Sequence, residues 1–172
     1  MYGSYGMSSL TLPEGLERIC DSALACNHLT SIHIPASVIT IEEALWFNEK
    51  LREVTVAEGS QNYTVKNGML LTKDLTGLVK IPSMLDSYDI PETVITIYGS
   101  SADMLNTKVL VIPDGVEVMG NMAFHSCDAL ETIVVGSGVK SWGEELFYGC
   151  NNIKSIYLLR KSGISNDRTF RI

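Results

Sequence analysis

The chain has 172 residues, of which 45% are hydrophobic, so it is long enough to bury a core and too apolar to be a disordered segment. The formal net charge is −7, and residues 1–153 alone hold 8 basic and 19 acidic residues, which disfavours binding to the phosphate backbone of a nucleic acid. No stretch reaches the ~18 apolar residues of a membrane span, and "MYGSYGMSS" lacks the charged and apolar regions of a signal peptide. We therefore expect one folded domain without a membrane span.

Residues 1–8 show no regular pattern and are expected to form a flexible leader. From residue 9 onward, short apolar alternations such as "IHIP" and "LVIP" recur, and apolar residues at i and i+2 indicate the inward face of a strand. The last inward residue of each alternation recurs at intervals of 22, 22, 34, 22, 23 and 23, namely at Leu12, Ile34, Val56, Ile90, Ile112, Val135 and Leu158. Since so short a unit cannot bury its apolar face alone, the pattern predicts a β-rich solenoid of about seven coils with a short parallel sheet.

The single long interval indicates an insertion at about residues 57–86. Asn67 and Gly68 favour a tight hairpin turn, because both residue types tolerate positive φ. "MLLT" and "LVKI" are interpreted as two strands joined through residues 73–77. We expect a β-hairpin that bulges from the solenoid, and both a functional role and a harmless loop elaboration are open.

Residues 159–172 lack the repeat pattern and carry several basic residues. They are expected to form a C-terminal tail or a cap, because an open solenoid end must be covered. The repeat region therefore covers residues 9–158. The basic tail is either a docking segment or a solvated chain end.

His125, Cys127 and Asp128 lie within four positions, which raises the question of a thiol nucleophile or a metal site. However, Cys127 aligns with Cys150 one period later, whereas His125 aligns with Tyr148. A nucleophile is unique to one site, whereas a structural position recurs in every coil. We therefore expect the repeat cysteines, Cys26 among them, to be small buried side chains, with disulfides between coils as the alternative.

No other pattern points to catalysis or to a bound cofactor. There is no C-x-x-C pair, no H-E-x-x-H, no P-loop and no G-x-S-x-G, and His28, His33 and His125 fall in different repeats. We expect no catalytic residue, no cofactor and no metal.

The repeat columns resemble those of the BspA-like leucine-rich repeat family. The resemblance rests on "LTSIHIPASVITI" at 29–41, "LVIPDGVEVMGNMAFHSCDALETIVV" at 110–135 and "VKSWGEELFYGCNNIKSIYL" at 139–158, and the insertion segment "QNYTVKNGMLL" is similar as well. Two units depart from it, because 41–51 lacks the cysteine and 97–108 has Ala102 in place of the aromatic residue. The resemblance implies a leucine-rich repeat solenoid that is secreted or on the cell surface, binds proteins such as host extracellular or matrix proteins, and catalyses nothing. A cytoplasmic location is the alternative.

If the apolar columns point inward, the intervening residues form the exposed face of the parallel sheet. The candidate protein-binding residues on this face are His33, Thr55, Asp89, Val109, Val111, Val134 and Tyr157. Exposed apolar groups often indicate contacts, although β-branched residues also suit exposed strands and the C-terminal tail could cover them. The first hypothesis is a non-catalytic, adhesin-like binding module. The alternative is a structural component whose hairpin and tail dock to neighbouring subunits.

Overall fold

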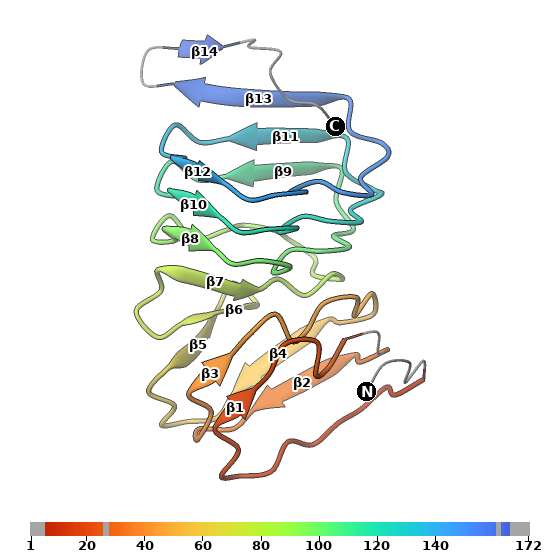
Figure 1. The fold of residues 1–172 in the computed structure, drawn as a ribbon, viewed down its shortest axis with the longest axis vertical. Coiled ribbons are helices and arrows are strands. Elements are labelled where there is room, and N and C mark those ends of the chain that lie inside the picture. Colours follow the sequence, from red (N-terminus) through yellow and green to blue (C-terminus); the bar gives the residue numbers. More distant parts are fainter. Residues whose placement is uncertain (1–5, 26–27, 161–162, 166–172) are drawn as a thin grey trace.

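The computed structural model describes the backbone of residues 6–25, 28–160 and 163–165, and this part of the chain consists of strands and turns with no helix (Figure 1). The strands are β1 (Arg18–Ile19), β2 (Ser31–Ile34), β3 (Thr40–Ile41), β4 (Glu53–Val56), β5 (Tyr63–Lys66), β6 (Met69–Thr72), β7 (Gly77–Lys80), β8 (Thr96–Ile97), β9 (Val109–Ile112), β10 (Val118–Met119), β11 (Thr132–Val135), β12 (Ser141–Trp142), β13 (Ser155–Arg160) and β14 (Gly163–Ser165).

Each regular coil contributes one longer strand and one two-residue strand, and the two kinds stack in separate layers (Figure 1). We call the layer of β2, β4, β9, β11 and β13 the face layer and the layer of the two-residue strands the second layer. Strands one repeat apart pair in parallel, so that Val111 lies beside Val134 and Val134 beside Tyr157. The predicted repeat solenoid and its register are therefore confirmed.

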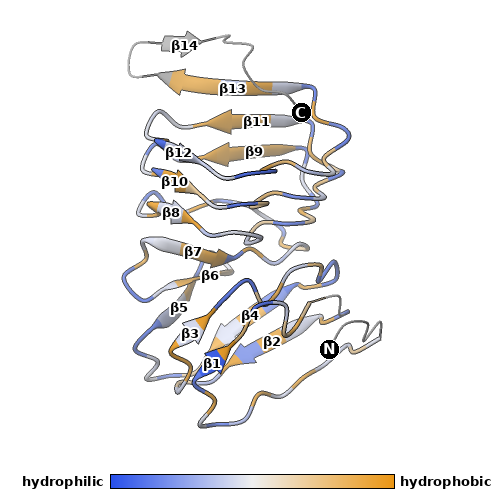
Figure 2. Cartoon of the chain, in the orientation of Figure 1, coloured by the Kyte–Doolittle hydropathy of each residue, from blue (hydrophilic) through white to orange (hydrophobic). Residues whose placement is uncertain are grey.

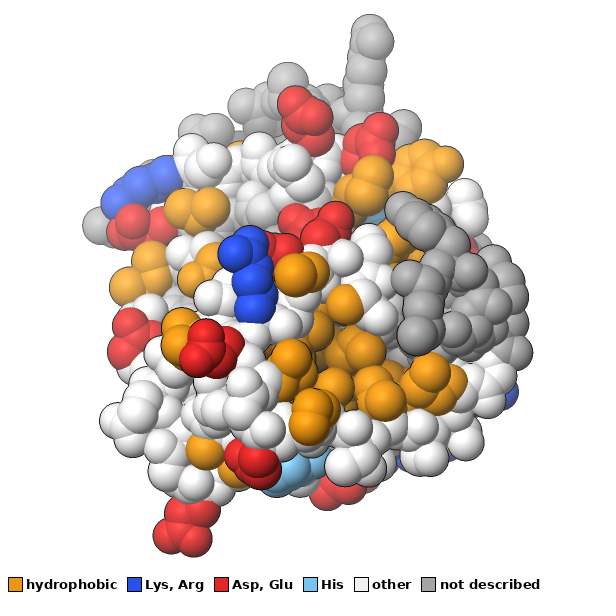
Figure 3. All heavy atoms as spheres, turned by 60° about the horizontal axis from the view of Figure 1, so that its bottom comes forward, with side chains coloured by type: hydrophobic (Ala, Val, Ile, Leu, Met, Phe, Trp, Pro, Cys, Tyr) orange, Lys and Arg blue, Asp and Glu red, His pale blue; other side chains and the backbone are white. Residues whose placement is uncertain are grey.

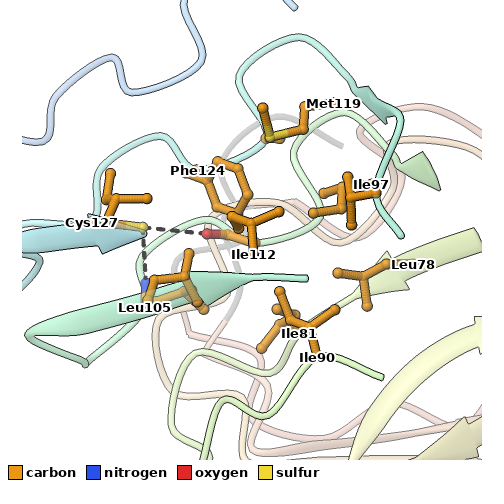
Figure 4. Close-up of a cluster of buried hydrophobic side chains, with 14 of the residues drawn as sticks. Leu78, Ile81, Ile90, Ile97, Leu105, Ile112, Met119, Phe124 and Cys127 are labelled. Atoms are coloured by element: carbon orange, nitrogen blue, oxygen red, sulfur yellow. Dashed lines mark hydrogen bonds between the residues drawn. The ribbon is translucent and has the colours of Figure 1, made fainter. Parts of the chain in front are cut away.

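The face strands alternate between exposed and buried residues because successive side chains of a strand point to opposite faces. The inward residues, such as Leu110 and Ile112, join the turn residue Phe124 in one apolar core (Figure 4). Phe124 is fully buried and stacks on Phe147 with 5.6 Å between ring centroids. Burial of such side chains stabilises the fold by about 1.5–3 kcal/mol each.

The turn has the same conformation after β8, β10 and β12. Its third residue has a positive φ in consecutive coils, 51° at Ser100, 52° at Met122 and 51° at Glu145. At the glycine two residues before this position, the backbones of neighbouring coils are in contact. An added Cβ on Gly120 would lie only 2.4 Å from the Gly99 nitrogen. This turn therefore keeps neighbouring coils close and in register.

The face layer is interrupted in the middle of the stack. β2 and β4 form one sheet, and β9, β11, β13 and β14 form another. The segments at 9–12 and 87–90, where the sequence also predicts face strands, run without strand pairing. The structure therefore divides into an N-terminal block, residues 6–56, and a C-terminal block, residues 91–160, with the insertion between them.

The predicted hairpin is confirmed, because β6 and β7 pair antiparallel, but the insertion holds one further strand. It has three strands, because β5 pairs with β6 across Asn67 and Gly68, whose φ angles are 52° and 74°. β6 then pairs antiparallel with β7, and β7 pairs in parallel with β8. The turn at Asn67 and Gly68 is confirmed, but the insertion continues the second layer of the solenoid and does not protrude from it.

Strand β6 separates the two hydrophobic cores. Leu70 packs in the core of the N-terminal block, whereas Met69 and Leu71 pack in that of the C-terminal block, and all three side chains are fully buried. A hairpin that bulged into solvent would expose one of its faces. The insertion is held inside the stack because both faces of β6 are apolar.

At the C-terminal end, β14 pairs antiparallel with β13 on the side away from β11. The remainder of the predicted cap, 161–162 and 166–172, lies outside the described residues, as do residues 1–5 of the predicted leader. Both expectations remain predictions.

Candidate protein-binding face

Six of the seven candidate residues fall into two sets, one on each block, and Asp89 lies just before the C-terminal block. In the N-terminal block, His33 on β2 lies directly beside Thr55 on β4, and both side chains are exposed. The His33 Nδ1 and the Thr55 Oγ1 are 2.8 Å apart and form a hydrogen bond. This half of the face is polar.

In the C-terminal block, the face layer carries a row of apolar side chains. Val109, Val111 and Tyr157 are 52%, 53% and 40% exposed, and Val134 between them is half-buried. Their strands β9, β11 and β13 are coloured as hydrophobic over much of their length, in contrast to β2 and β4 (Figure 2). We call Val109, Val111, Val134 and Tyr157 the apolar stripe.

A hollow of about 540 Å³ lies at one end of the apolar stripe, where the missing face strand would run. Asp89, Tyr88 and Asn106 line it together with Val109 and Val111, so the structure brings three of the predicted residues together. The Tyr88 hydroxyl accepts a hydrogen bond from the Asn106 backbone N–H at 3.2 Å. Burial raises the pKa of Tyr88, which keeps this hydroxyl protonated.

A second hollow, of about 590 Å³, lies beside β4 and is lined by Thr55, Tyr63 and Lys73 among others. Arg52, Glu53 and Glu58 also line it, so both charge signs are present. The two hollows therefore differ in chemistry, since only the one at the apolar stripe combines exposed valines with hydrogen-bonding groups.

The cysteines that recur with the repeat form a ladder in the turns. The backbone N–H of Leu105 donates to the Cys127 Sγ at 3.4 Å, and this thiol donates to the Ala102 carbonyl at 3.3 Å (Figure 4). One coil further, Cys150 Sγ accepts from the Cys127 N–H and donates to the Phe124 carbonyl. Each thiol thus satisfies backbone groups of the coil before it.

Cys127 is a small buried side chain in the turn, as the sequence predicts. Its hydrogen bond with Cys150 and its burial raise the pKa of its thiol, which opposes formation of a thiolate. Cys20, Cys127 and Cys150 are free thiols, so the alternative of disulfides fails for them. Cys26 lies outside the described residues.

Asn48 takes the place of the cysteine in the unit that lacks it. Its Nδ2 donates to the Leu24 carbonyl at 2.8 Å and to the Leu45 carbonyl at 3.0 Å, and the side chain is buried. Sequence reasoning missed this role, although Asn48 lies 22 residues after Cys26.

The sequence also gave no indication of a buried charged cluster, in which Lys80 pairs with Asp103 next to His125. Nor did it single out Ile95, Tyr98 and Val118, which are exposed on the second layer. Tyr98 and Val118 are adjacent to the buried Ile97 and Met119, and this alternation is a signal that could have revealed these two. Within the described ranges, no group of His, Cys, Asp and Glu is placed to hold a metal ion, and no helix could cross a membrane.

Three solved structures with similar folds are leucine-rich proteins of bacteria. One from Eubacterium ventriosum superposes with a TM-score of 0.78 at 27% identity and covers 87% of this chain. A leucine-rich cell surface protein from Faecalibacterium prausnitzii has a TM-score of 0.72 at 26% identity over 84% of the chain, and a protein from Bacteroides ovatus has 0.51 at 26% over 82%. This chain spans 41%, 46% and 34% of those chains, less than half of each. No functionally curated protein matches it.

The fold and the face therefore define a leucine-rich repeat solenoid. The pattern described as BspA type Leucine rich repeat region matches in six copies over residues 1–72 and 82–171. The chain belongs to this family, whose repeats are generally non-catalytic.

Proposed function

We propose that the chain is a non-catalytic, adhesin-like module that binds a protein partner through the apolar stripe and the adjoining hollow. The observation that carries the proposal is the row of Val111, Val134 and Tyr157 across three neighbouring strands of an acidic protein. Val109, two residues before Val111 on the same strand, is exposed as well. Apolar patches rimmed by polar groups are typical of contact surfaces, and tyrosine is enriched among the residues that dominate binding energy.

The geometry of the stripe favours binding in two further ways. Its residues lie on three paired strands, so little conformational entropy is lost when a partner docks. The hollow beside it offers Asp89 and the Tyr88 hydroxyl as polar groups that fix orientation. The partner that we propose is a host extracellular or matrix protein, with this chain secreted or on the cell surface. The similarity to a leucine-rich cell surface protein supports that location.

The second candidate function is a structural component that assembles with its neighbours. Figure 3 brings the N-terminal end forward and shows hydrophobic side chains gathered on it. Half-buried apolar residues at this end are Met7, Leu10, Leu12 and Leu16. The insertion offers less to a neighbouring subunit than expected, because the side chains of Met69, Leu70 and Leu71 are fully buried.

The test is capture of proteins from serum and matrix extract by the purified chain, read by mass spectrometry. A variant with Tyr157→Ala and Val134→Ser removes the centre of the stripe, and a variant with His33→Ala and Thr55→Ala is the matched control on the other block. A partner held by the wild type and the control but lost by the stripe variant supports the proposal. Equal retention by all three contradicts it, and self-association in sedimentation without any captured partner favours assembly.

A further inference from the structure

Lys80 and Asp103 form a buried pair, and further groups surround the Asp103 carboxyl. Lys80 ends β7 of the insertion, and Asp103 lies in the turn of the following coil. Their side chains are 2% and 1% exposed, and the Lys80 Nζ contacts the Asp103 Oδ1. Taking both charges out of water is costly for an ion pair.

The carboxyl group of Asp103 is also held from its other side. Its Oδ2 accepts a hydrogen bond from the Phe47 backbone N–H at 2.6 Å. A backbone N–H in this position stabilises negative charge that develops on a carbonyl oxygen during attack at its carbon. The carboxyl is thereby fixed with one oxygen toward the amine and the other toward a donor.

His125 provides a group that can carry a proton next to this carboxyl. Its Nδ1 is 2.9 Å from the Met122 carbonyl, an acceptor, so Nδ1 bears the hydrogen and the neutral ring has a free lone pair on Nε2. That Nε2 is buried without a hydrogen-bond partner, 3.9 Å from the Asp103 Oδ2. The rings of Trp46 and Phe47 pack on the imidazole at centroid distances of 6.1 and 4.8 Å and shield it from water.

From this arrangement we infer that Lys80 and Asp103 condense to an intramolecular amide bond. A proton first passes from the ammonium to the carboxylate, and the Lys80 nitrogen then attacks the Asp103 Cγ. The nitrogen passes its second proton to Oδ1, the carboxyl oxygen that it contacts, and this oxygen leaves as water while Oδ2 becomes the carbonyl oxygen of the amide. One C–N bond forms, one C–O bond breaks, one water is released, and nothing is oxidised or reduced.

The amide bond would join the insertion to the C-terminal block at the level where the face layer is interrupted. The inference does not depend on the proposed binding function, since it concerns a covalent link inside the stack.

The direct test is the intact mass of the full chain under denaturing conditions. We expect the wild type to be lighter than its sequence mass by one water, and Lys80→Arg and Asp103→Ala to show their full masses. Because the measurement needs no folded variant, a wild type at its full sequence mass overturns the inference outright.

A cyclic imide at an aspartate also loses one water, so the link must be located. Trypsin together with a protease that cuts after Glu92 separates the Lys80 segment from the Asp103 segment. We expect the two segments to stay joined and Lys80 to resist trypsin, whereas separate peptides with cleavage at Lys80 would contradict the inference.

Discussion

The N-terminal and C-terminal blocks have the same coil and different surfaces. Inward residues are alike, since Ile32 and Ile34 in one block and Leu110 and Ile112 in the other are all buried aliphatic side chains. Outward residues differ, because β2 and β4 present polar groups where β9, β11 and β13 present the apolar stripe. Stacking constrains the inward positions only. The outward positions are therefore the ones that can distinguish the function of one block from that of the other.

In the turns of both blocks, a side chain at the same repeat position bonds backbone groups of the neighbouring coil. Cys127 and Cys150 satisfy backbone groups in the C-terminal block, and Asn48 does so in the N-terminal block. Because an amide can replace a thiol at this position, the position requires a small polar side chain that bonds the neighbouring coil. It does not require thiol chemistry.

The largest effect is expected from loss of the aromatic core in the C-terminal block. Phe124→Ala should lower the free energy of unfolding by about 3–5 kcal/mol, because it leaves a cavity in a core that cannot collapse fully. Urea denaturation measures this, with Tyr148→Ala as an exposed aromatic control. An unchanged midpoint would mean that the repeat register is wrong.

Strand β6 allows the two cores to be perturbed from adjacent positions. Leu70→Ala and Leu71→Ala should each cost about 2–5 kcal/mol, because both side chains are fully buried. Hydrogen exchange should show lost protection mainly in β2 and β4 for Leu70→Ala, and mainly in β9 and β11 for Leu71→Ala. Identical exchange patterns would show that the two blocks are one cooperative unit.

Substitutions at the turn positions Cys127 and Asn48 should lower the free energy of unfolding by a smaller amount, which should be equal in the two blocks. Cys127→Ala and Asn48→Ala each leave buried backbone groups unpaired, which costs about 1–3 kcal/mol. Cys127→Ser keeps a donor and an acceptor and should cost less than Cys127→Ala. Denaturant midpoints measure the series, with exposed Cys20→Ala as the control. If serine were as damaging as alanine, hydrogen bonding would not be the role of the thiol.

The smallest effect is expected at the surface of the C-terminal block. Hydrogen bonds from Lys154 and Lys108, 2.6 and 3.0 Å away, lower the pKa of Glu131. Since the folded-state pKa lies below the usual 4.5, this stabilisation is complete above 4.5 and disappears as the pH falls below it. Glu131→Gln should therefore reduce stability slightly at neutral pH and not at low pH, and added salt should reduce the difference. A loss that persists at low pH would indicate a packing role instead.

The sequence predicted the solenoid because its inward columns are set by local alternation and a fixed period. It predicted the alignment of Val111, Val134 and Tyr157 for the same reason, since these residues follow the period. It could not predict the path of the insertion, because Leu70 and Leu71 look alike in the sequence and only long-range pairing decides which core receives each one.

Two features of the candidate site were beyond prediction for related reasons. The hollow at Asp89 exists because the segment at 87–90 does not pair as a strand, although its alternation resembles that of the other coils. Lys80 has the appearance of an outward strand residue in "LVKI", and nothing in its neighbourhood reveals the partner 23 residues later. Pairing across the degenerate unit depends on the fold of the insertion.

The antiparallel direction of β14 limits how copies of this protein can associate. An unpaired strand edge can template a strand of another molecule. The edge of β13 that faces away from β11 is already paired with β14, which runs antiparallel to the coils below it. A second copy therefore cannot continue the parallel face layer directly on β13.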